Sequence, residues 1–149
     1  MLRIRTHRLG AAGVLALLDD EAGLEALRST VADSGSSPEA RMRAAVYLGR
    51  AGHGEVSEQL RAILEDGDRV GAANALAMLG DQRAVPALVE HLAIAAMRVE
   101  AAISLRRLNA EIDLQPLAVA LVESDEIGRV SAAEAILVLT GSEPPAELR

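Results

Sequence analysis

The sequence contains no cysteine, lysine, tryptophan or phenylalanine, and it has a single tyrosine, Tyr47. Without cysteine the chain can form no disulfide, thiol nucleophile or cysteine-based zinc site. The histidines, His7, His53 and His91, are not spaced as metal ligands, so we expect no metal and no cofactor. Without large aromatic side chains the core must consist of Ala, Leu, Val and Ile, which suits closely packed helices better than strands.

Acidic residues outnumber basic ones by 22 to 15, which gives a net charge of −7 at pH 7. This balance opposes unselective binding to phosphate backbones, so we expect no nucleic-acid partner. Half of the 149 residues are hydrophobic, enough for a single domain over residues 1–149 with a continuous core. The longest apolar runs fall short of the roughly 20 residues that a membrane span needs, so we expect no membrane partner.

The beginning of the chain imitates a secretory signal, because a basic segment, MLRIRTHR, precedes an apolar one, LGAAGVLALL. No small-x-small cleavage site follows, and the apolar run stops at Asp19-Asp20-Glu21. The same ten apolar residues also fit an internal repeat. We therefore expect a cytoplasmic protein.

The internal repeat is marked by pairs of alanines at intervals of 33, 28, 29 and 31 residues. The pairs are Ala11-Ala12, Ala44-Ala45, Ala72-Ala73, Ala101-Ala102 and Ala132-Ala133. The same intervals align apolar columns, among them Leu15, Leu48, Leu76, Leu105 and Ile136. A second apolar set follows each segment, with members four residues apart, as at Leu88 and Leu92. The pattern therefore predicts two amphipathic helices in each unit.

Turn and cap residues separate these helices, as at 34–38, 52–54 and Gly80-Asp81. The pattern predicts nine helices, at residues 8–18, 21–33, 38–51, 54–66, 69–79, 83–95, 97–109, 113–123 and 127–140. Acidic clusters such as Asp19-Asp20-Glu21 and Asp125-Glu126 fall at the boundaries, where we interpret them as helix caps rather than metal ligands. One helix pair cannot bury its apolar stripe alone, so neighbouring pairs must stack around a shared core. The expected fold is an all-α solenoid.

Residues 73–92, ANALAMLGDQRAVPALVEHL, resemble the HEAT-like repeat of the type first described in phycobilin lyases. The resemblance rests on the alanine-rich helix, the LGD turn and the RAVPAL start of the next helix, and it extends over nearly the whole chain. Other units depart from this pattern, since Gly52-His53 and Asn109-Ala110 replace Gly-Asp. The resemblance implies a right-handed superhelix whose alanine-rich helices line the concave side.

The repeat intervals also align an arginine at the start of each alanine-rich helix. This column consists of Arg8, Arg41, Arg69, Arg98 and Arg129. One interpretation is a ladder of guanidinium groups that grips an extended anion. The other is structural, with stems packed on apolar surface and heads bonded to carboxylates or carbonyls of neighbouring loops. Helical phase favours the structural interpretation, because it turns the column toward the buried side. The resemblance agrees, since HEAT-like repeats commonly carry such an arginine.

The candidate binding surface is the face of each alanine-rich helix that lies opposite its buried residues. A merely solvated face would consist mainly of Glu, Arg and Gln, whereas this one mixes apolar residues with charged ones. The candidate protein-binding residues are Arg43, Val46, Tyr47, Arg50, Asn74, Met78, Ile103 and Arg107. The alternative is that the small apolar residues only tighten the curvature between neighbouring repeats.

No phosphate-binding loop, Ser-His-Asp arrangement or pair of catalytic carboxylates can be assembled, so we assign no catalytic residue. The leading interpretation is a non-catalytic scaffold or adaptor that binds a protein or peptide along its concave face. An alternative is an enzyme or accessory subunit similar to bilin lyases that binds a small molecule. A nucleic-acid reader similar to the HEAT-like alkylpurine glycosylases would need a basic surface with aromatic residues, and the net charge of −7 argues against it.

The last expected helix lacks the polar outer face that a terminal solenoid unit needs. Its segment 135–139 reads AILVL, and helical phase turns Leu137 and Val138 away from the preceding repeat. We expect a homodimer through this C-terminal repeat rather than cover by residues 142–149.

Overall fold

The computed structural model describes residues 2–66 and 69–141, with the side chains at positions 2–7, 66 and 69 outside the description. Every regular element within these ranges is helical, and nine of them are α-helices, which confirms the predicted class and helix number. The alanine-rich helices, called inner helices below, are α1 (Leu2–Ala16), α3 (Pro38–Arg50), α5 (Arg69–Met78), α7 (Arg98–Arg107) and α9 (Glu126–Thr140). The outer helices are α2 (Glu21–Ala32), α4 (Ser57–Asp66), α6 (Val85–Leu92) and α8 (Gln115–Glu123).

The helix bounds agree with the predicted ones to within a few residues, with one clear exception. Helix α1 begins at Leu2, six positions before the predicted start at residue 8. Two of the predicted outer helices begin with a turn of 3-10 helix, over Gly54–Val56 and Gln82–Ala84. Such turns are common at helix N-termini.

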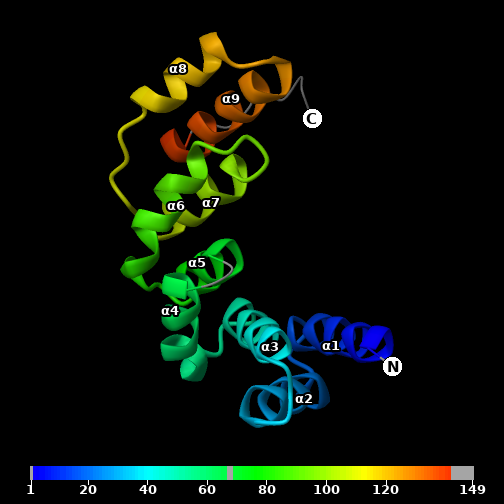
Figure 1. The fold of residues 1–149 in the computed structure, drawn as a ribbon. Helices are drawn as coiled ribbons and strands as arrows, with labels where there is room; N and C mark the ends of the chain where they lie inside the picture. The colour runs from blue at the N-terminus through cyan, green and yellow to red at the C-terminus, as the bar shows by residue number, and fades with distance from the viewer. Residues whose placement is uncertain (1, 67–68, 142–149) are drawn as a thin grey trace.

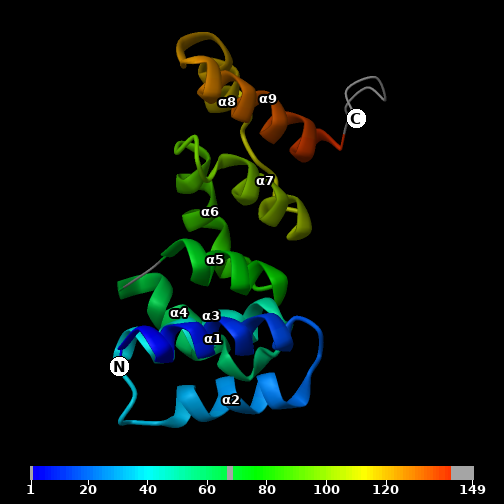
Figure 2. The same cartoon turned by 90° about the vertical axis from the view of Figure 1, so that its right-hand side faces the viewer.

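The helices stack into two layers. Each inner helix contacts the next inner helix along the stack. The outer helices α2, α4 and α6 pack on the inner helices that flank them in the chain, whereas α8 packs mainly on α9. Figure 1 shows α4, α6 and α8 on one side of the stack and α5, α7 and α9 on the other. In Figure 2 the same helices rise from α2 at the bottom to α8 and α9 at the top. The chain is therefore a solenoid, whereas the right hand of its superhelix stays a prediction.

The core follows the repeat. In the three middle units both members of each alanine pair are buried, and the leucine column is completely inaccessible at Leu48, Leu76 and Leu105. Leu88 and Leu92 are buried as predicted, while Leu79 is only half-buried. Alanine carries a single methyl group, so its pairs let the backbones of adjacent helices approach closely.

Each inner helix is followed by a residue with a left-handed backbone. The five residues, with positive φ, are Asp19, Gly52, Gly80, Asn109 and Gly141. In the first four units the next amide donates to the carbonyl of the leucine column, as from Asp81 N to Leu76 O at 2.9 Å and from His53 N to Leu48 O at 3.0 Å. This is the Schellman arrangement, which satisfies the last carbonyls of a helix. The leucine that fills the core therefore also fixes where its helix ends.

Acidic and hydroxyl side chains cap the other ends, which confirms the interpretation of two acidic clusters. Asp20 accepts from Gly23 N at 3.0 Å, and Asp125 accepts from Gly128 N at 2.8 Å. Ser37 caps α3 by accepting from Ala40 N at 3.2 Å. These bonds satisfy amide groups that have no partner within the helix.

The two ends of the stack expose apolar residues that are covered in the middle. Leu15 and Leu18 of the first unit are exposed, Leu18 to 73%, although Leu48 and Leu76 are inaccessible at the positions equivalent to Leu15. At the other end Val130 is 54% exposed, although its equivalent in the first unit, Leu9, is buried.

The expectation for the last helix was wrong in its residues. Leu137 and Val138 are both half-buried, and Val138 packs against the core instead of pointing away from it. Helix α9 contacts both α7 and α8. The exposed apolar side chains of this end are Val122, Ile127 and Val130. The tail 142–149, weighed as a cover, lies outside the described residues.

We expect Leu76→Ala to lower the free energy of unfolding by about 2–5 kcal/mol, because it leaves a cavity in a completely buried position. Urea denaturation followed by circular dichroism measures the effect. The matched control is Ile103→Ala, at an exposed position of the next inner helix, where we expect a loss below about 1 kcal/mol. Equal losses for the two variants would contradict the repeat register.

Candidate functional site

The inner helices present a band of exposed apolar and basic side chains, which we call the inner stripe. Its members are Val14, Leu17, Arg50, Met78, Ile103 and Arg107. Of these, Met78 and Ile103 are 43% and 48% exposed although they are large and apolar. Arg50, Met78, Ile103 and Arg107 were predicted as binding residues, and the structure places all four at the surface.

Three further predicted residues, Arg43, Val46 and Tyr47, are half-buried. The Tyr47 ring lies on Gly13 of α1, where a Cβ atom would come within 2.7–2.9 Å of ring atoms. Glycine is therefore needed at position 13 for this close approach. Tyr47 thus fixes α3 against α1 and offers only part of its ring to a partner.

Asn74 was expected on the binding surface, and this was wrong. It is buried, and its Oδ1 atom accepts a hydrogen bond of 2.9 Å from the hydroxyl of Ser104, which is also buried. Helical phase places position 74 opposite the alanine pair, but α7 packs against this side of α5. The bond between Ser104 and Asn74 satisfies two polar groups that burial would otherwise leave unpaired.

The surface is continued from α5 to α7 by a contact between Arg107 and Met78. The Arg107 guanidinium lies against the Met78 sulfur. A flexible thioether beside a cation is an adaptable contact surface, because both side chains can change rotamer when a partner packs on them.

One charged side chain of the inner helices, Arg98, is buried. Its Nε atom donates to the Leu92 carbonyl at 2.6 Å and its Nη2 atom to the Ala93 carbonyl at 3.3 Å, at the C-terminal end of α6. Its Nη1 atom donates to Gly128 O at 2.8 Å and to Ser131 Oγ at 3.0 Å, on α9. The guanidinium group therefore connects three helices, and it lies where the α6 dipole favours a positive charge.

The other members of the arginine column do not share this environment. Arg8, Arg41 and Arg129 are exposed, although helical phase turns the column toward the buried side. Arg129 donates to the Ser124 carbonyl at 3.2 Å. The side chain of Arg69 lies outside the described residues.

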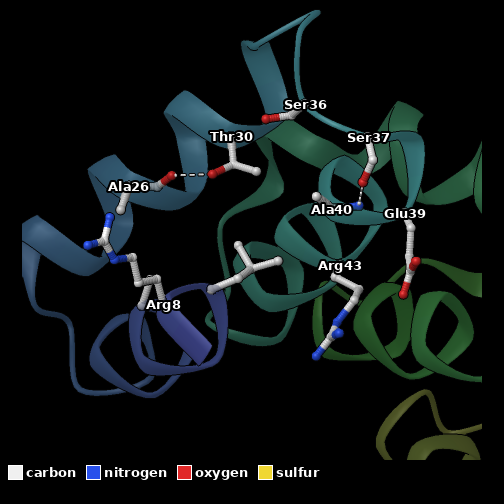
Figure 3. Close-up of a pocket in the computed structure, with 10 residues that line it drawn as sticks. Arg8, Ala26, Thr30, Ser36, Ser37, Glu39, Ala40 and Arg43 are labelled. Carbon is white, nitrogen blue, oxygen red and sulfur yellow. Dashed lines mark hydrogen bonds between the residues drawn. The ribbon is translucent and has the colours of Figure 1, made fainter. Parts of the chain in front are cut away.

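A cavity of about 350 Å³ lies between α1, α2 and α3. Its polar side chains are Arg8, Thr30, Ser36, Ser37, Glu39 and Arg43, and its apolar ones are Leu9, Ala12, Ala26 and Ala40. Figure 3 shows Arg8 and Arg43 on opposite sides of this pocket, with Thr30 and Ser37 above them. Sequence reasoning placed Arg8 in the structural column and missed the hydroxyl residues altogether. The sequence does contain one sign of this pocket: in the alignment of the repeats, Arg43 occupies the position that Ser131 has in the last unit.

A second hollow, on the outer helices, is surrounded by paired charges. Arg61 donates to Asp81 at 2.8 Å and also pairs with Glu58, and Arg83 pairs with the other Asp81 oxygen at 3.2 Å. Burial by itself would raise the pKa of Asp81, but bonds from the Arg83 amide and the Arg61 guanidinium outweigh it and leave this pKa below its usual value. These ion pairs connect α4 to the turn before α6, and both arginines of the hollow are paired with carboxylates of the chain.

The helices of the described ranges are not long and apolar enough to cross a membrane. In the same ranges no three His, Asp or Glu side chains lie together in an arrangement that could hold a metal ion.

Comparison with known proteins identifies the repeat. A family model of HEAT repeats matches residues 31–95. These residues include helices α3 to α6, which form two consecutive inner–outer pairs. Curated proteins and solved structures gave no match.

We expect Arg98→Ala to lower the free energy of unfolding by about 2–4 kcal/mol, because it removes the buried hydrogen bonds that join α7 to the Leu92 carbonyl of α6 and to Gly128 and Ser131 of α9. The control is Arg129→Ala, in the same repeat column but exposed, with an expected loss below about 1 kcal/mol. Chemical denaturation of both variants measures the difference. A stable Arg98→Ala variant would show that the buried guanidinium does not hold α6, α7 and α9 together.

Proposed function

This chain is a HEAT-like repeat protein, and on that premise we propose that it is a non-catalytic scaffold that binds an extended segment of a partner protein along the inner stripe. The observation that carries the proposal is the exposure of Met78 and Ile103 on adjacent inner helices. Large apolar residues beside arginines are typical of protein interfaces, where Met and Arg are enriched.

The charges of the inner stripe suggest the chemistry of the partner segment. Arg50 forms no hydrogen bond or ion pair with any described residue, and Arg107 has only the Met78 sulfur. A segment with acidic side chains between apolar ones would complement both kinds of group. The proposal includes a cytoplasmic location, which suits a chain without disulfides.

We also propose that copies of the chain associate head to tail, so that the unmodified chain forms dimers and longer assemblies. Within the chain, the Leu48 and Leu76 faces are covered by stacking between units, whereas Leu15 and Leu18 are exposed at one end of the stack and Val130 at the other. The two exposed faces correspond to the two sides of an internal unit boundary. A second copy is therefore the occupant that each face fits best, and such a contact is heterologous.

The partner proposal predicts that peptides selected from a random library on the intact chain bind at the inner stripe. Met78→Asp and Ile103→Asp should each weaken binding of a selected peptide at least about tenfold, because they put a charge into the apolar contact. Fluorescence polarisation gives the affinities.

The matched control for this test is Val89→Asp on outer helix α6, where the valine is 42% exposed. We expect it to leave the affinity unchanged. Selected peptides that tolerate both inner-stripe variants, or that are lost with Val89→Asp, would overturn the proposed surface.

The self-association proposal predicts that Val130→Asp and Leu18→Asp each yield a monomer in light scattering at micromolar concentration. A mixture of the two variants should form a dimer, because one intact face of each kind remains. The control is Val119→Asp on α8, which we expect to behave as the unmodified chain. A monomeric unmodified chain would contradict the association, and a Leu18→Asp variant that still dimerises would show a symmetric contact instead.

A further inference from the structure

We propose that the cavity between α1, α2 and α3 is a binding site for a carboxylate group on a short aliphatic body, bound by Arg8 and Arg43, the two unpaired arginines of its lining. This site is separate from the inner stripe and does not depend on the function proposed for it.

The alignment of the repeats shows which hydrogen-bonding partners Arg8 lacks. Arg8 is the equivalent of Arg98, whose Nη1 atom donates to Ser131 Oγ and to Gly128 O on the next inner helix. The repeat intervals align Arg129 with Arg41, so Ser131 is equivalent to Arg43 and Gly128 to Ala40. In the first unit a second cation therefore stands where Arg98 finds a hydroxyl acceptor. Arg98 also donates to two carbonyls at the end of the outer helix before it, whereas α1 is the first helix described, so Arg8 lacks both sets of acceptors and lines the cavity instead.

The two guanidinium groups are not neutralised by the protein. Neither Arg8 nor Arg43 forms a hydrogen bond or an ion pair with any residue that the structure describes. Arg28, Arg61 and Arg83, by contrast, are all paired with carboxylates. In Figure 3 the guanidinium groups of Arg8 and Arg43 lie at opposite edges of the pocket and point away from one another, so binding requires their long side chains to turn toward the ligand. Two unpaired cations in one lining attract an anion, and a guanidinium group is suited to bind a carboxylate through two parallel hydrogen bonds.

The remaining lining selects the kind of anion. Glu39 also lines the cavity but pairs with neither arginine, so the three charged side chains sum to one positive charge, which a singly charged carboxylate balances. Thr30 and Ser36 already donate their hydroxyl hydrogens to Ala26 O and Asp33, whereas Ser37 only accepts a bond from Ala40 N. Ser37 can therefore donate to the ligand.

The apolar part of the lining accepts an aliphatic body. Its four members come from α1, α2 and α3, namely Leu9, Ala12, Ala26 and Ala40. The volume of about 350 Å³ lies at the lower end of the range for small-molecule pockets. A ligand of this chemistry is either a free short-chain acid or the carboxylate end of a peptide with an aliphatic last residue.

The test is a titration of the intact, ¹⁵N-labelled chain with hexanoate, followed by the arginine Nε–H resonances. We expect Arg8 and Arg43 signals to shift with a dissociation constant in the millimolar range, about 1–10 mM for so small a ligand. Hexanamide, which has the same body without the charge, should cause no such shift.

Three variants test where hexanoate binds. Arg8→Gln and Arg43→Gln should each weaken hexanoate binding at least about fivefold, because each removes one charged donor pair. The matched control is Arg50→Gln, which also removes an unpaired arginine of α3 but lies outside the cavity lining; its affinity should be unchanged. Circular dichroism checks that all three variants stay folded.

The source of the carboxylate is distinguished with the tripeptide Ala-Ala-Leu and its C-terminal amide. Tighter binding of the free-acid tripeptide than of hexanoate supports a peptide C-terminus, and the reverse order supports a small acid. Equal binding of hexanoate to the unmodified chain, Arg8→Gln and Arg43→Gln overturns the site. So does equal binding of hexanoate and hexanamide, or no shift with any probe. Peptide selection on the inner stripe is unaffected by these outcomes, so the two proposals fail separately.

Discussion

The close approach of neighbouring inner helices is the constraint on which the rest of the structure depends. Alanine pairs lie at these contacts, and Gly13 and Gly49 occur where a Cβ atom would meet Tyr47 or Leu60 and Ala75. Small residues bring each inner helix into contact with the next, whereas the outer helices mainly contact their inner neighbours. Closer spacing on one side bends a stack toward that side, so the prediction that the inner helices line the concave face is consistent with their small residues. The aliphatic composition therefore determines the shape as well as the core.

The ends of the inner helices are tied to the same contacts. The carbonyls of Leu15, Leu48, Leu76 and Leu105 accept the bond that closes each helix, and a residue with positive φ follows in every unit. Glycine adopts this backbone without strain, whereas Asp19 and Asn109 adopt it at a cost of about 1 kcal/mol each. In the first four units the chain reverses at the same distance from the column leucine, so the repeat keeps its register although its length varies between 28 and 33 residues.

The helices could be predicted because their determinants are local: the spacing of Leu and Ala, the capping side chains and the glycine turns all lie within a few residues. The surface was harder to predict, because helical phase describes one helix and not its neighbours. Asn74 has the phase of a surface residue, yet α7 covers it and Ser104 satisfies it. Leu137 and Val138 likewise have the phase of uncovered residues, but α9 packs on two helices at once. Contacts between units decide these cases, and no single unit contains them.

The arginine column shows how the neighbours of a guanidinium group separate a structural role from a binding role. Arg98 donates to the end of α6 before it and to Gly128 and Ser131 of α9 after it, so its hydrogen-bonding groups connect α6, α7 and α9. Arg8 has the same position in its own helix, but α1 is the first helix described, and Arg43 stands at the position equivalent to Ser131. Arg8 therefore has neither set of acceptors and lines a cavity as an unpaired cation. A degenerate repeat can gain a ligand site without any change to its core, because the partners of a column arginine come from the neighbouring helices and not from its own.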